Sequence, residues 1–130
     1  MFQGGIIAVI IFIAILCSLG EHLYWVWKIK QLKQYILPII DDYNLRHVPI
    51  TPRFFGAITF DKRKITMCIR YNYSVPQLAY VLLHEYAHVL TVSIGHTPEF
   101  WERFADMLQR AKIRDIYIDE YFANHPYCAR

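Results

Sequence analysis

Residues 74–104 read SVPQLAYVLLHEYAHVLTVSIGHTPEFWERF and contain both clear helix starts and the most chemically informative motif of the chain. The first helix start is a cap. Ser74 is followed three residues later by Gln77, and Pro76 would lie in the first turn, a combination typical of a helix N-terminus. We therefore expect a helix over residues 75–93.

A second helix is expected directly after the first. Gly95 supplies a stop, because glycine readily adopts the left-handed backbone conformation that ends many helices. Thr97 and Pro98 then provide a new cap and a proline at the first helical position. The apolar face of this helix follows at helical spacing and consists of Phe100, Phe104, Met107, Leu108 and Ala111.

Inside the first of these helices lies the pattern H-E-x-x-H, formed by His84, Glu85 and His88. Residues four apart share one face of an α-helix, so both imidazoles can bind the same zinc ion. Glu85 would lie beside the ion, where its carboxylate can accept a proton from the water that zinc activates. The pattern predicts a Zn²⁺ site with His84 and His88 as ligands and Glu85 as the catalytic base.

A catalytic zinc site usually has three protein ligands and leaves one position for water. His96 is the expected third ligand, because the turn at Gly95 can bring the chain back toward the helix. Glu99 and Glu102 remain alternatives, since sites with two histidines and one glutamate also exist. The histidines without ligand spacing are interpreted as interfacial, loop and tail residues: His22, His47 and His125.

The region before this motif has the pattern of a helix followed by a small sheet. Apolar side chains recur at helical spacing over residues 28–46, and Pro38 must kink or restart that helix. The two prolines of residues 48–52 favour extended backbone. Residues 53–60 and 65–71 are rich in β-branched and aromatic side chains and flank a polar tetrapeptide, which predicts a β-hairpin.

Residues 4–20 form an apolar run without a charged side chain or histidine. A helix needs about 20 apolar residues to cross a bilayer. The run reaches that length if Glu21 and His22 lie at the level of the lipid headgroups, beside three aromatic residues suited to that interface, Tyr24, Trp25 and Trp27. We expect an uncleaved anchor over residues 1–27 that contacts membrane lipid through residues 4–27.

The basic residues that flank the apolar run all follow it: Lys28, Lys30 and Lys33. By the positive-inside bias, residues 28–130 are expected on the cytoplasmic side of a membrane crossed once, which could be a viral membrane. A cleaved signal peptide is an alternative, but it would have basic residues before the apolar run. A buried core helix is the other alternative.

Composition limits the classes of protein that remain. With 130 residues, 55% of them hydrophobic, the chain has room for one compact domain and is too apolar to be intrinsically disordered. Residues 28–130 contain all 14 basic and all but one of the 11 acidic residues, a net charge of +4, with no basic and aromatic stripe, so a nucleic-acid partner is not expected. Without a C-x-x-C pair, neither a disulfide framework nor a cysteine zinc site is indicated, and three cysteines are interpreted as buried or incidental thiols: Cys17, Cys68 and Cys128.

Residues 65–104 resemble the SprT-like and WLM group of small zinc metallopeptidases, which have a minimal gluzincin-like domain. The matching features are a strand, a proline-containing helix start, H-E-x-A-H, and a Gly-His-x-x-x-Phe element that opens the next helix. The resemblance implies one general base, Glu85, and three metal ligands, His84, His88 and His96. It also matches two aromatic packing positions, Phe100 and Trp101.

The expected fold is α+β, with an N-terminal transmembrane helix followed by a minimal zincin-like domain. That domain would consist of a helix, a β-hairpin or small sheet, the motif helix and a second helix, with a short helix before Pro126. The expected function is that of a membrane-anchored zinc metallopeptidase that hydrolyses peptide bonds of protein or peptide substrates. Strand 65–71 would bind an extended substrate by edge pairing.

Two further expectations concern the chemistry. Tyr86, Tyr117 and Tyr121 are candidate donors to the oxyanion, although each is more readily explained as a packing aromatic. The alternative function is a non-catalytic membrane or virion assembly protein that keeps the fold and the zinc, since a metal can contribute folding energy. A DNA-associated repair protease ranks last, because of the anchor and the modest charge.

Overall fold

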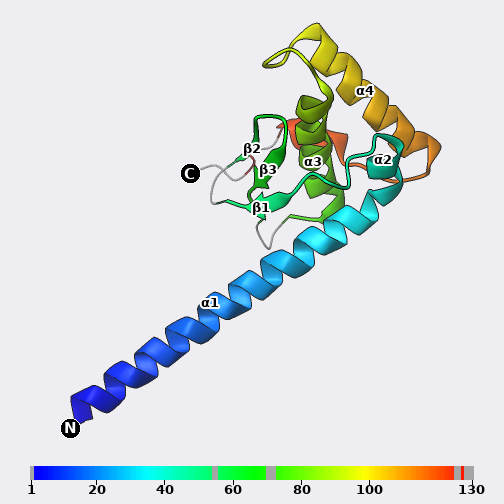
Figure 1. Cartoon of the computed structure of the whole chain (residues 1–130). Helices are drawn as coiled ribbons and strands as arrows, with labels where there is room; N and C mark the ends of the chain where they lie inside the picture. Colours follow the sequence, from blue (N-terminus) through cyan, green and yellow to red (C-terminus); the bar gives the residue numbers. More distant parts are fainter. Residues whose placement is uncertain (1, 54–55, 70–72, 125–126, 128–130) are drawn as a thin grey trace.

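The computed structural model describes residues 2–53, 56–69, 73–124 and 127 (Figure 1). Over these ranges the order of elements is α1, α2, β1, β2, β3, α3, α4 and the 3-10 helix η1. The expected α+β class is confirmed: a long apolar helix at the N-terminus precedes a small three-stranded sheet and further helices.

Helix α1, Phe2–Tyr35, is continuous over 34 residues. At 1.5 Å per residue it is about 51 Å long, against roughly 30 Å for the hydrocarbon core of a bilayer. Within the described ranges it is the one helix whose length and composition would allow it to cross a membrane. Its large apolar side chains from Ile6 to Leu19 are each more than half exposed, so this part is not a core helix of the domain.

The C-terminal end of α1 belongs to the domain, since Leu32 and the following Ile36 are fully buried. Helix α2, Leu37–Asp42, begins directly afterwards with Pro38 in its first turn. The helix expected over residues 28–46 is therefore two helices, and the first of them is the end of α1. The division into residues 1–27 and 28–130 stays a prediction, and α1 runs through its boundary without a break.

The sheet consists of β1 (Ile50–Pro52), β2 (Ala57–Phe60) and β3 (Lys64–Met67), in the order β1-β3-β2. β2 and β3 are antiparallel, which confirms the hairpin with shorter strands than expected. Its turn has positive φ at both Asp61 (48°) and Lys62 (56°), as in the type I′ turns that join many hairpins.

The structure overturns one expectation about this sheet. β3 lies at its centre, with β1 parallel on one side and β2 antiparallel on the other. The prediction that strand 65–71 binds a substrate by edge pairing is therefore wrong for residues 65–67, because β3 pairs with a neighbour on each side. Residues 70–71 lie outside the described residues. Among the described strands, the free edges belong to β1 and β2.

Helix α3, Val75–Leu90, begins with the expected capping box: Gln77 N donates to Ser74 Oγ (3.4 Å), and Ser74 N donates to Gln77 Oε1 (2.9 Å). It ends three residues earlier than predicted. Helix α4, Pro98–Ile113, is capped by Thr97 as expected, and η1, Glu120–Asn124, corresponds to the short helix predicted near the C-terminus.

Helix α3 is the centre of the core and packs between the sheet, α4, η1 and the end of α1. Its inward residues Leu78, Leu82 and Leu83 are fully buried. The expected apolar face of α4 is confirmed. Leu108 is partly buried, and the other four residues are buried: Phe100, Phe104, Met107 and Ala111. Full burial of one phenylalanine or methionine side chain contributes roughly 1.5–3 kcal/mol to stability, and burial of this face holds α4 against α3.

The cysteine prediction is wrong for one residue. Cys68, which directly follows β3, takes part in a disulfide. Cys17 is a free, exposed thiol on α1, as expected. Cys128 and His125 lie outside the described residues.

Candidate metal centre

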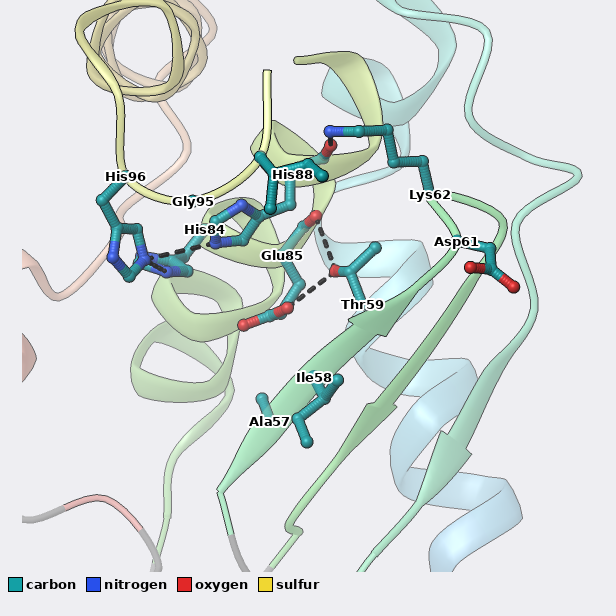
Figure 2. A pocket seen from close by; sticks show the side chains of 11 residues that line it. Ala57, Ile58, Thr59, Asp61, Lys62, His84, Glu85, His88, Gly95 and His96 are labelled. Atoms are coloured by element: carbon teal, nitrogen blue, oxygen red, sulfur yellow. Dashed lines mark hydrogen bonds between the residues drawn. The ribbon is translucent and has the colours of Figure 1, made fainter. Parts of the chain in front are cut away.

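Three imidazoles meet at the C-terminal half of α3. His84 and His88 lie on one face of the helix, and the turn at Gly95, where φ is +86°, brings His96 over them (Figure 2). The Nε2 atom of His96 lies 3.1 Å from that of His84 and 3.2 Å from that of His88. All three ligand nitrogens are within 4.8 Å of one another.

Hydrogen bonds alone do not account for this convergence. The Nε2 atom of His96 carries either one proton or one lone pair, so it can satisfy only one of its two close contacts. Two nitrogen ligands of a tetrahedral zinc ion, each roughly 2.0–2.1 Å from it, are about 3.3–3.4 Å apart. The observed separations are close to that value, so the three histidines fit a shared metal ion.

The two glutamates considered as third ligands lie elsewhere. Glu99 Oε1 accepts a hydrogen bond from Val92 N (2.7 Å), and its other oxygen lies 3.5 Å from Ser93 Oγ. Glu99 therefore closes the loop between α3 and α4. Neither it nor the exposed Glu102 belongs to the convergent group, which contains His96.

Aromatic side chains of α4 support the imidazoles. Phe100 is fully buried and stacks on His88, with ring centroids 4.3 Å apart, and its edge meets His84 at 4.8 Å. Burial, followed by the neighbouring histidines, lowers the pKa of His84 to about 4, and burial also lowers the pKa of His88. Both rings are therefore neutral at pH 7, the state that binds a metal.

Glu85 projects from the next position of α3 toward the sheet and is only 5% exposed. Thr59 Oγ1 of β2 lies 2.7 Å from Glu85 Oε2 and donates to it. Burial raises the pKa of the Glu85 carboxyl, while the Thr59 hydrogen bond and the charge of Arg53 oppose this rise. A buried carboxylate with a raised pKa is suited to accept a proton near neutral pH.

An open cavity of about 640 Å³ lies between β2 and the three histidines (Figure 2). Ala57, Ile58 and Thr59 of β2 form one wall, and Glu85 lies at its base. A second cavity of about 340 Å³ shares Ala57, His84 and Glu85 with the first and has an aromatic wall: Tyr80, Trp101, Phe122 and Tyr127. The site thus has room for an extended chain and for an apolar side chain.

The candidate oxyanion donors do not reach this site. Tyr86 is fully buried in the core, and its hydroxyl has no hydrogen-bond partner among the described residues. Tyr117 and Tyr121 are 65% and 81% exposed and line neither cavity. Tyr86 therefore agrees with the alternative interpretation of a packing aromatic, whereas Tyr117 and Tyr121 are too exposed to fit it.

Lys62 is a supporting residue that the sequence did not indicate. It lies in the turn between β2 and β3, and its Nζ donates to the carbonyl oxygens of His88 (2.9 Å), Ser93 (3.0 Å) and Thr91. The carbonyls of His88 and Thr91 lie at the C-terminal end of α3, where the helix dipole favours a positive charge, and that of Ser93 lies in the loop that follows. Lys62 therefore joins the hairpin to the part of α3 that carries His88.

Substituting Lys62→Met is expected to lower the free energy of unfolding by about 1–2 kcal/mol, because three carbonyls lose a charged donor. Thermal or denaturant unfolding of the full chain in detergent measures this. Lys64→Met is the matched control, since Lys64 is exposed in the same hairpin and should change stability little. Equal losses in both variants would contradict the role given to Lys62.

Comparisons with known proteins add distant similarities. No family model matches the chain. It is 34% identical over 70 residues to the uncharacterized protein 136R of Invertebrate iridescent virus 6, in a match that covers 47% of this chain and 38% of that protein. The match therefore spans less than half the length of that relative.

Among solved structures, the fold is similar to the metallopeptidase zymogen abylysin of Pyrococcus abyssi. The TM-score is 0.45 at 20% sequence identity, and the match covers 67% of this chain and 98% of that one. This is a distant likeness of fold, and the resemblance to the SprT-like and WLM group stays a prediction.

Proposed function

We propose that the chain is a membrane-anchored, zinc-dependent peptidase in which His84, His88 and His96 bind the ion and Glu85 is the general base. The observation that carries this proposal is the convergence of three imidazole nitrogens beside a buried carboxylate at the base of an open cavity. Three imidazole ligands suit zinc among the metals of biological sites, and such a set leaves a fourth position open.

When bound, a zinc ion at such a site supplies Lewis acidity to water and to a carbonyl oxygen. The carboxylate of Glu85 accepts the proton of the attacking water and returns it to the nitrogen of the leaving amine. Thr59 keeps that carboxylate in place by donating to Oε2, while the second oxygen points away from Thr59. Phe100 fixes the ring of His88 by stacking on it.

The edge of β2 is the proposed binding surface for the substrate. Within the described sheet β2 pairs only with β3, so its outer edge has free backbone groups next to the cavity. An extended peptide can add there as a further strand, with its scissile bond near Glu85. The aromatic cavity beside His84 would then accept an apolar side chain of the substrate.

Helix α1 is the proposed membrane anchor. Its length and composition are sufficient, and its apolar N-terminal part lies outside the domain. The three lysines after this part favour a cytoplasmic domain. The disulfide of Cys68 is typical of an oxidising compartment. The lysines and the disulfide thus favour opposite sides of the membrane for the domain. We therefore propose that α1 is an anchor and assign the domain to neither side.

The test measures metal content and peptidase activity of the full chain purified in detergent, with denatured protein as substrate. We expect roughly one zinc ion per chain, loss of cleavage after chelation, and recovery with zinc but not with magnesium. A chain without zinc would contradict the metal site. Zinc without cleavage would favour the non-catalytic membrane or virion protein instead.

A further inference from the structure

A separate hollow lies where α1 meets the sheet. Its volume is about 440 Å³, and it shares no lining residue with the cavity at the histidines. One wall is the part of α1 from His22 to Gln34, and the other is formed by Leu37 together with β1. We call this hollow the juxtamembrane groove.

The length of α1 places the juxtamembrane groove at the membrane surface. About 20 residues fill the hydrocarbon core, which accounts for the apolar run and ends close to His22. The headgroup layer adds roughly 5–8 Å on each side, or about three to five residues of helix. His22, Trp25 and Val26 then lie among the headgroups, and the rest of the groove extends beyond them.

The chemistry of the groove is apolar and positively charged. Val26, Ile29 and Ile50 contribute apolar surface, while Lys30 and Lys33 contribute two ammonium groups. Neither lysine has an ion-pair partner within the described ranges, and no acidic residue lines the groove. The groove begins at headgroup level and carries two unpaired cations just beyond it, so it complements a molecule that joins an acyl chain to a negative headgroup.

We propose that the juxtamembrane groove binds one anionic phospholipid, with its phosphate at Lys30 and Lys33 and an acyl chain along Val26, Ile29 and Ile50. This inference rests on the membrane anchor of the proposed function and is independent of peptidase activity. The bound lipid would contact both α1 and β1 and so hold the domain close to the bilayer surface.

The test reconstitutes the full chain in phosphatidylcholine vesicles that contain a minor fraction of phosphatidylglycerol. The chain is then extracted in mild detergent, and native mass spectrometry counts the retained lipids. One variant combines Lys30→Gln and Lys33→Gln. The matched control combines Lys28→Gln and Lys64→Gln, which remove the same charge outside the groove: Lys28 lies over the ring of Trp27, and Lys64 begins β3.

We expect the native chain and the control pair to retain about one phosphatidylglycerol, enriched over phosphatidylcholine relative to the vesicles. The groove pair should retain it at least roughly tenfold less. Equal retention of both lipids, or equal losses in both pairs, would overturn the lipid site. Alkaline extraction of the vesicles tests the anchor separately: a chain that stays inserted without selective lipid overturns the groove alone, whereas a released chain overturns anchor and groove together.

Discussion

Replacing Glu85 with glutamine is expected to lower the rate of peptide cleavage by about 10²–10⁴-fold while zinc stays bound. Glutamine has nearly the same shape and can still accept the hydrogen bond that Thr59 donates at 2.7 Å. It has no basic oxygen, however, and cannot take a proton from water. The three histidines are unchanged, so the metal content should remain that of the native chain.

The measurement compares the rate of cleavage and the zinc content of the native chain, Glu85→Gln and Glu102→Gln. Glu102 is the matched control because it is an exposed carboxylate on the neighbouring helix, outside the convergent group. Unchanged cleavage in Glu85→Gln would remove Glu85 from the mechanism. Loss of zinc in this variant would show instead that the carboxylate supports the metal site.

The pH dependence of the native rate provides a further check on Glu85. The base must be deprotonated to act, and burial raises the pKa of this carboxyl above its ordinary value of 4.5. The rate should therefore rise with pH along a limb centred above pH 4.5. A limb centred at or below that value would indicate that this carboxylate is not the titrating base.

Local features of the sequence predicted the elements that carry the site. The Ser74 and Gln77 capping box, the cap at Thr97 and the turn at Gly95 each depend on residues a few positions apart, and all are present. The same short range brought His96 to His84 and His88, because helix and turn together cover only 13 residues. Such signals can be read without knowledge of the tertiary fold.

Features that depend on distant contacts were not predictable in this way. The parallel pairing of Ile50 with Ile65 puts β3 at the centre of the sheet, and nothing in residues 65–71 shows on which side a neighbour will lie. Lys62 reaches the end of α3 across 26 to 31 residues of chain. The disulfide of Cys68 likewise was not predictable, because the sequence has no C-x-x-C pair that would indicate it. Each is a product of packing rather than of local pattern.

The strongest effect on the metal itself is expected from His96→Ala. This substitution leaves two histidine ligands, and zinc affinity should fall by more than the roughly 10–100-fold that loss of a residue behind a ligand causes. His96 is exposed and lies in the turn before α4, so its removal should leave the core intact. Cleavage should be lost in parallel, because the variant would be largely free of zinc.

Two comparisons make this prediction specific. Glu99→Gln should keep zinc within about tenfold of the native affinity, because Glu99 is bonded to Val92 N in the loop rather than directed at the histidines. If Glu99→Gln bound zinc more weakly than His96→Ala, Glu99 would be identified as the third ligand and the role of His96 would be contradicted.

Free imidazole should partly restore zinc binding to His96→Ala, since it can enter from solvent where the ring was removed. A variant that is merely misfolded would not respond to imidazole, so this rescue separates a lost ligand from a lost fold.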